Sequence, residues 1–247
     1  MPELYEDDAP PKPAPRRLRK FAVVLALIII GVVAVAGGGT GLTLELTRHA
    51  TATEARAAGW AELTSRWQRI PAGQIFPAQL SYMDLAQSTL TLTRIGIAPP
   101  ANCRQAADPA VGGILATAGC VTVLRATYID GAGAVAATIG IAVMRSNAAA
   151  ARANSDLSSE TAGVDAYTVP GTAAGQFGNA DRQLSAELYP GESPYIILDT
   201  AGFTDGIPRV AGPADPALSD LLNAVPNDLL ATLAPPGAPC RERNVRC

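Results

Sequence analysis

Uncharged residues fill every position from Phe21 to Leu44, 24 in a row between Lys20 and Glu45. A helix of this length spans about 36 Å at ~1.5 Å per residue, whereas the hydrocarbon core of a bilayer is ~30 Å thick. The pattern therefore predicts a transmembrane helix over residues 21–44. Residues 1–20, rich in proline and charge, are expected to form a disordered tail.

Beyond the apolar run, residues separated by alternating steps of four and three positions fall along one side of a helix. This stripe includes Thr53, Ala57, Trp60 and Trp67. The spacing predicts a helical stalk over residues 45–70 that continues directly from the membrane span and ends before Pro71. Two interpretations remain open: the stripe joins two stalks in a homodimer, or its tryptophans pack the stalk against its own domain. The many Ala and Thr residues on the stripe favour the second.

Residues 71–234 combine strands of alternating polarity with short helices. The predicted hairpins and helices have no repeating strand–helix–strand pattern, which indicates an α+β domain with helices on one face of an antiparallel sheet. Residues 235–247 are expected to form a cysteine-containing C-terminal tail. The expected elements are a strand over 89–98, hairpins pairing 120–130 with 134–144 and 182–190 with 195–203, and helices over 108–119, 146–159 and 217–233.

Basic residues stand directly before the predicted span, at Arg16, Arg17, Arg19 and Lys20. Lys and Arg are in excess on the cytoplasmic side of transmembrane helices, so we expect a cytoplasmic N-terminus and an extracytoplasmic C-terminal domain. A cleaved secretory signal is the alternative, because residues 34–36 read Ala-Val-Ala, the form of a cleavage site after Ala36. The long, partly acidic N-terminal region and the length of the apolar run favour a retained single-pass anchor.

The net charge of the chain and the position of its basic residues indicate which classes of partner it can bind. The chain carries a net charge of −3 at pH 7, which gives no basic face for nucleic acid. The basic cluster before the span suits lipid headgroups, so the bilayer is an expected partner. Both lysines precede residue 21, and Ala, Gly and Pro are abundant, which indicates a GC-rich bacterial coding bias.

All four cysteines lie beyond the predicted anchor, at Cys103, Cys120, Cys240 and Cys247. An oxidising exterior favours two disulfides, for which three connectivities exist. Nearby thiols meet most often, so we expect Cys103–Cys120 and Cys240–Cys247. A zinc site would need a C-x2-C pair or a histidine ligand beside them, and neither is present. No metal or other cofactor is therefore predicted.

The order of these elements carries a resemblance. A stalk with two tryptophans, the letters IFP, a pair of cysteines and the hairpin RATYID…ATIGIAV follow the anchor. This arrangement, over residues 60–145, resembles uncharacterised single-pass exported proteins of actinobacteria. The resemblance implies an exported location and this bacterial group, and it transfers no functional residue.

Most nucleophilic mechanisms lack a necessary residue. His49, the only histidine, lies in the predicted stalk, which removes Ser-His-Asp and Cys-His pairs from the domain. Lysine is absent after Lys20, which removes Ser-Lys and Schiff-base chemistry. The letters DTAG at 199–202 resemble the D-x-x-G motif of GTPases and the D-T-G of aspartic proteases. Neither the phosphate-binding lysine loop nor a second D-T-G copy accompanies them.

A pair of carboxylates is the remaining catalytic possibility, as in glycoside hydrolysis. We expect the candidate acids to be solvated at strand ends and turns, and we predict no catalytic residues. These acids are Asp84, Asp130, Glu187, Asp199 and Asp205.

These observations predict a non-enzymatic, membrane-anchored binding or accessory module of the bacterial cell envelope, which contacts an envelope protein, the cell wall or lipid. One alternative is a ligand sensor that signals across the membrane, and another is a carboxylate-based envelope hydrolase. Sensing would require a cytoplasmic partner for residues 1–20.

Overall fold

The computed structural model describes residues 20–21, 23–35, 51–83, 87–157, 163–178, 181–189, 191, 193–207, 218–222, 229 and 233. The chain divides into two compact units, one formed by the first 50 residues and the other beginning at Thr51. Each unit is described by itself.

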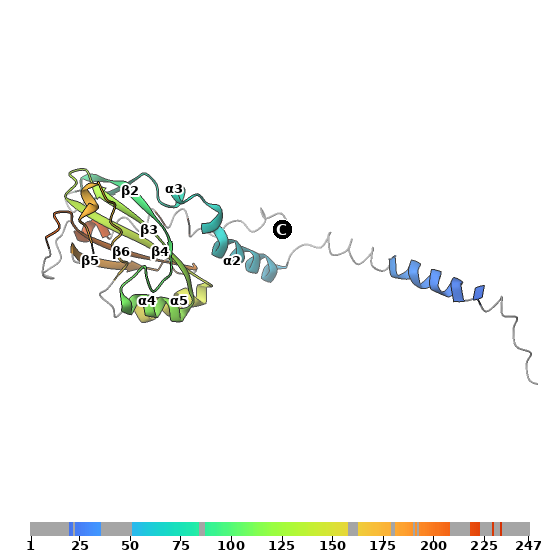
Figure 1. The fold of residues 1–247 in the computed structure, drawn as a ribbon. Helices are drawn as coiled ribbons and strands as arrows, with labels where there is room; N and C mark the ends of the chain where they lie inside the picture. The colour runs from blue at the N-terminus through green and yellow to red at the C-terminus, as the bar shows by residue number, and fades with distance from the viewer. Residues whose placement is uncertain are drawn as a thin grey trace, which may run out of the picture. The chain divides into compact units, whose positions relative to one another are not determined.

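In the first unit, residues 20–21 and 23–35 are helical (Figure 1). Their large apolar side chains are exposed, from Phe21 at 77% to Val35 at 76%. No helix among the described residues is both long enough and apolar enough to cross a membrane. Residue 22 and residues 36–44 of the predicted span, and Arg16, Arg17 and Arg19 before it, lie outside the described part.

The second unit is built on a six-stranded sheet in the order β1-β2-β3-β4-β6-β5 (Figure 1). Every neighbouring pair is antiparallel. The predicted α+β class and both predicted hairpins are therefore confirmed, whereas β1 was not predicted. The strands are β1 Gln79–Met83, β2 Thr89–Ala101, β3 Cys120–Asp130, β4 Val135–Met144, β5 Arg182–Leu188 and β6 Tyr195–Phe203.

Helical residues cover both faces of this sheet, so the prediction of helices on one face is wrong. The cause lies in β4, where Ile139 and Ile141 face one core cluster while Ala142 and Met144 face the other. A strand buried on both faces is apolar at successive positions and needs cover on both sides. The first cluster is covered by the end of α2 (Ala52–Arg69), α3 (Ala72–Ile75) and helical residues within 218–233, and the second by α4 (Pro109–Ala118) and α5 (Asn147–Leu157) (Figure 1).

Helix α2 has an N-terminus of its own. The Thr51 hydroxyl accepts the Glu54 N–H at 3.3 Å, and the Glu54 carboxylate accepts the Thr51 N–H at 2.8 Å, which together form a capping box. Thr51 has extended backbone with ψ 157°, so the helix begins after it. The predicted unbroken helix from the membrane span into the stalk is therefore wrong at Thr51. The helix ends at Arg69, as the following Pro71 predicts.

The C-terminal half of α2 packs against the first core cluster. Trp67 contacts this cluster, and Arg66 Nη1 donates to the Leu233 carbonyl at 3.0 Å. Trp60 is half-buried, whereas Thr53 and Ala57 at the other end of the predicted stripe are exposed. The stripe therefore changes character along the helix, from exposed at its start to packed on the domain at its end.

An irregular segment, residues 163–178, crosses the sheet face beside α4 and α5, and we call it the strap. Glycines on the strands let it lie close to the sheet. A Cβ at Gly140 would come within 2.7 Å of Val164, and one at Gly96 within 2.6 Å of Val169. The Tyr167 backbone bonds to the sheet through its N–H to Thr138 at 2.9 Å and its carbonyl to Thr127 at 2.6 Å. These threonines satisfy the polar backbone of a segment that runs over an apolar core.

Two tyrosines in the first core cluster resist ionisation. Burial raises the pKa of Tyr195 to about 12, opposed by the nearby Arg66 charge, and burial also raises the pKa of Tyr128. The Tyr195 hydroxyl donates to the Leu63 carbonyl of α2, and the Tyr128 hydroxyl donates to the Pro77 carbonyl at 3.0 Å. Both rings therefore tie the sheet to the segments that cover it.

Stability is expected to fall as the pH rises from 10 to 12. Tyr195 ionises near pH 10 when unfolded but only near 12 when folded, so the unfolded chain binds fewer protons over this range. The loss from Tyr195 approaches about 1.4 kcal/mol per pH unit. Urea unfolding at a series of pH values measures it, and Tyr195→Phe should flatten the slope while costing about 1 kcal/mol at neutral pH. An unchanged slope in Tyr195→Phe would contradict the assignment.

Candidate functional site

The candidate acids that the structure describes have structural roles. Asp130 ends β3, and its Oδ1 accepts the Ala134 N–H at 2.7 Å and the Val135 N–H at 3.0 Å, closing the turn into β4. Asp205 follows β6, and its Oδ1 accepts the Ile207 N–H at 3.1 Å. Carboxylates that accept local N–H groups in this way stabilise turns.

Asp199 differs from these, because it lies inside the sheet on β6 and is only 1% exposed. Its register partners are Ile139 on β4 and Ala186 on β5. The DTAG letters therefore belong to a fully covered strand, where no substrate reaches them. Asp84 and the Glu187 side chain lie outside the described part, so the structure places no pair of the candidate acids around a cleft.

The cysteine prediction is confirmed for one pair. Cys103 and Cys120 form a disulfide with a Cα–Cα distance of 6.3 Å and a sequence separation of 17. It closes the loop that contains α4, and Cys103 is 3% exposed within the second core cluster. The predicted pairing of Cys240 with Cys247 lies outside the described residues.

Metal-ligating side chains do not gather in the part of the chain that the structure describes. Within it, no group of three or more His, Cys, Asp or Glu residues is placed to hold an ion. Asp108, an acid within the disulfide loop, has basic and backbone partners instead. Its carboxylate receives two N–H groups of Arg182, at 2.6 and 2.7 Å, and the Gly163 N–H at 2.7 Å.

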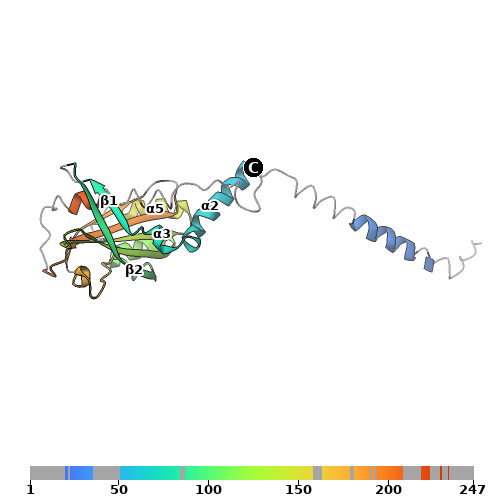
Figure 2. The same ribbon diagram turned by 90° about the horizontal axis from the view of Figure 1, so that it is seen from above.

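Among the described strands, β1 and the first part of β2 are the most exposed, and they lie at one end of the sheet order (Figure 2). On β1 the burial alternates, so Leu80 and Tyr82 face the first core cluster while the intervening residues face the other way. On that opposite side neither helix nor strap covers the hairpin, and all six side chains are exposed. We call this surface the open hairpin face; it consists of Gln79, Ser81, Met83, Thr89, Thr91 and Thr93.

The register arranges the open hairpin face as three cross-strand pairs, Gln79 with Thr93, Ser81 with Thr91 and Met83 with Thr89. Residues directly opposite each other on antiparallel strands point to the same side, so these side chains form one flat array. It contains four hydroxyls, one amide and one thioether, and no charge. Such an array can donate and accept hydrogen bonds but offers no nucleophile with a base and no ion pair for a phosphate.

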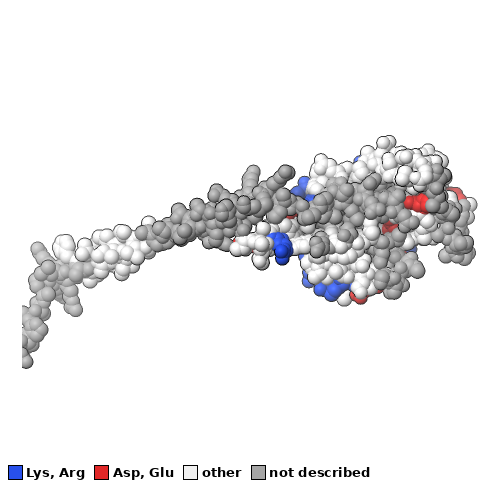
Figure 3. Space-filling model, turned by 180° about the vertical axis from the view of Figure 1, so that it is seen from behind, with Lys and Arg blue, Asp and Glu red and all other residues white. Residues whose placement is uncertain are grey.

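On the face shown in Figure 3, charged side chains cover little of the described surface. Lys and Arg, and likewise Asp and Glu, appear there only in small separate patches. This distribution agrees with the low charged content of the chain, 17%. Contacts made by the described surface would therefore rest on neutral hydrogen bonding and apolar packing more than on charge.

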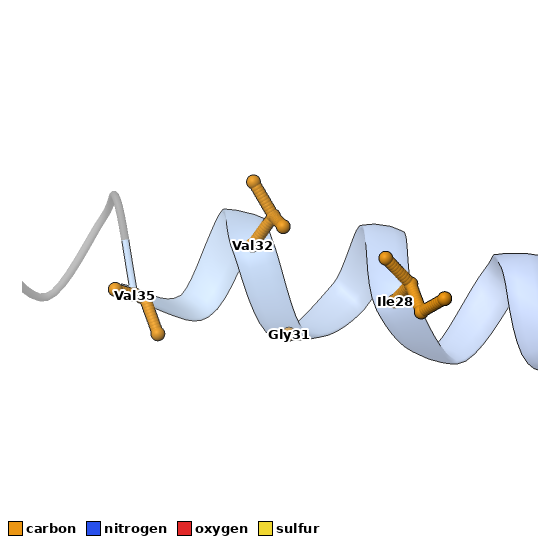
Figure 4. Close-up of a pocket in the computed structure, with 4 residues that line it drawn as sticks. All are labelled: Ile28, Gly31, Val32 and Val35. Carbon is orange, nitrogen blue, oxygen red and sulfur yellow. The ribbon is translucent and has the colours of Figure 1, made fainter.

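The helix of the first unit carries a shallow apolar hollow. Ile28, Val32 and Val35 project from the helix, and Gly31 leaves an open position between them (Figure 4). A Cβ at Gly31 would meet nothing within 4 Å. Lys20, from the predicted topology signal, is the first described residue of this helix and is exposed.

The open hairpin face was missed at the sequence level because β1 was not predicted. The available signal was the alternation in Gln-Leu-Ser-Tyr-Met, which is short and lies directly behind Phe76 and Pro77. The same alternation in Thr-Leu-Thr-Leu-Thr of β2 did predict a strand with one polar face. A strand with one polar face needs a neighbouring strand for its backbone hydrogen bonds. Residues 79–83, which precede β2 and alternate in the same way, supply that neighbour.

A scan of protein-family models, a search of curated proteins and a search of solved structures each found no match to the chain.

Proposed function

We propose that the protein is a membrane-anchored, non-enzymatic binding or accessory module of the bacterial cell envelope, with its α+β domain outside the membrane. The Cys103–Cys120 disulfide is the observation that carries this proposal. Structural disulfides form and persist in oxidising compartments and are rare in the cytosol of most bacteria. A disulfide in the core of the domain therefore supports export of the residues that follow the anchor.

The exposed apolar helix supports the anchor. Its large apolar side chains between Phe21 and Val35 are all more than half exposed. Contiguous apolar surface of this kind is unfavourable in water, whereas lipid tails surround it without that cost. The basic residues before it are the expected cytoplasmic flank.

The open hairpin face is the contact surface we propose. The central strands β4 and β6 are buried along almost their whole length, so they are not available for binding. The hairpin presents hydroxyl and amide groups in a fixed register on a rigid sheet. These groups suit a partner with uncharged polar groups. The acids whose carboxylates accept backbone N–H groups in turns are not on this surface, so it has no catalytic carboxylate.

A charged residue in the apolar helix is expected to release the protein from the membrane. Ile28→Arg places a charge inside the proposed span, about 7 Å from its centre, at a cost of up to about 2.5–3.5 kcal/mol, the value at the helix centre. Ile207→Arg is the matched control, because Ile207 is 56% exposed and Ile28 57%, but Ile207 belongs to the domain. Extraction of membranes with alkaline carbonate measures the difference.

Wild type and Ile207→Arg should remain in the membrane pellet, while a substantial share of Ile28→Arg should appear in the supernatant. Wild-type protein in the supernatant with a mass that begins after Ala36 would instead establish a cleaved signal. Equal retention of all three proteins would show that the helix is not the anchor.

A further inference from the structure

The two edges of the sheet differ in how they are protected. Exposed edge strands pair readily with other strands, and proteins commonly protect them with charges, prolines or bulges. The edge strand β5 contains Arg182 and Glu187, and its register shifts between Arg182 and Leu184. The edge strand β1, Gln-Leu-Ser-Tyr-Met, has no charge and no proline, and its register with β2 is regular.

The register between β1 and β2 determines which backbone N–H and C=O groups of β1 point away from β2. The Arg94 N–H donates to the Ala78 carbonyl at 2.9 Å, and Gln79 lies opposite Thr93. Hydrogen-bonded and non-hydrogen-bonded pairs alternate along an antiparallel ladder, so Leu80 and Tyr82 bond to β2. The N–H and C=O groups of Gln79, Ser81 and Met83 therefore point outward. In the part of the chain that the structure describes, no strand pairs with this edge.

We propose that β1 is a self-association edge, at which the β1 strands of two copies of this chain pair antiparallel about a two-fold axis at Ser81. In this register Ser81 pairs with its own copy, and Gln79 pairs with Met83 of the other copy. Every outward N–H and C=O of these three residues then finds a partner. Leu80 comes opposite Tyr82 of the other copy, on the side of the first core cluster.

Charge and side-chain exposure favour a second copy as the occupant. Like charges placed opposite each other across paired strands are destabilising, and this edge has none. Met83 is 58% exposed, and the pairing would cover part of it against Gln79 of the other copy. The edge is only five residues long, so we expect a weak dimer whose population rises with protein concentration.

Disulfide trapping tests the register. Ser81→Cys is introduced into full-length protein in detergent, with Cys240 and Cys247 replaced by Ser, and mild oxidation is followed by non-reducing electrophoresis. Detergent imposes no common bilayer, so the two copies can adopt whichever orientation the edge requires. Directly opposed residues in a hydrogen-bonded pair have Cα atoms about 5.5 Å apart, within the range of a disulfide. Thr91→Cys is the matched control, because Thr91 is exposed on the neighbouring strand and cannot reach its copy.

Sedimentation at a series of concentrations tests whether the edge drives association. Wild type and Thr91→Lys should dimerise alike, whereas Ser81→Lys should raise the dissociation constant at least about tenfold by placing like charges at the axis. Rapid cross-linking of Ser81→Cys but not Thr91→Cys supports the pairing. Wild type that stays monomeric at its highest soluble concentration overturns it, as does a dimer that Ser81→Lys leaves unchanged.

Discussion

Replacing Cys103 and Cys120 together with Ala is expected to lower the free energy of unfolding by about 3 kcal/mol. The disulfide joins residues 17 positions apart, and a closed loop of that length restricts the unfolded chain by roughly this amount. The loop contains α4, whose Val111 and Leu115 lie in the same core cluster as Cys103. Loss of the link therefore also loosens one of the two helices that cover this face.

Urea unfolding of the full-length protein in detergent measures this loss. Val121→Ala is a suitable control, because Val121 neighbours Cys120 but is 57% exposed and should change stability by only about 0.5 kcal/mol. A double cysteine variant as stable as Val121→Ala would show that the disulfide has little structural importance. It would also weaken the disulfide as support for export of the domain.

Asp108→Ala is expected to destabilise the domain by about 3–5 kcal/mol, the range for removing one partner of a buried ion pair. Asp108 and Arg182 are 15% and 17% exposed, and two short hydrogen bonds join them. Asp108 also accepts the Gly163 N–H at the start of the strap. Its removal therefore takes this acceptor away from both the largely buried Arg182 guanidinium and the Gly163 N–H.

A double variant separates the ion pair from the other effects. Asp108→Ala with Arg182→Met removes the buried charge that the single variant leaves behind, so it should be more stable than Asp108→Ala alone. Chemical unfolding of the wild type, both single variants and the double variant gives the coupling energy. Additive losses from the two single changes would contradict a direct energetic link between α4 and β5.

The sequence predicted local structure well where one pattern decided the outcome. The β-branched runs around Gly131 and Gly133 predicted the β3–β4 hairpin, and Asp108-Pro109 predicted the start of α4. The Asp108 side chain, however, makes no capping bond in α4 and instead binds Arg182. That partner is 74 residues away, and no local pattern indicates a contact over such a separation.

The features missed at the sequence level depend on tertiary contacts. The β-branched residues of β4 predicted one strand of a hairpin, but only the assembled sheet shows that separate layers cover its two faces. The open hairpin face is exposed because neither the strap nor α4 and α5 cover residues 79–83 and 89–93 on that side of the sheet. The candidate acids could be enumerated from the sequence, whereas the burial of Asp199 could not.

The central claim, a domain displayed outside the membrane behind a cytoplasmic tail, is tested most directly by labelling intact cells with a membrane-impermeant maleimide. Single cysteines at Thr91, on the open hairpin face, and at Ala9, before the span, are introduced into protein with Cys240 and Cys247 replaced by Ser. We expect Thr91→Cys to be labelled in intact cells and Ala9→Cys only after the cells are opened. Labelling of Ala9→Cys in intact cells, with Thr91→Cys protected until lysis, would contradict the account.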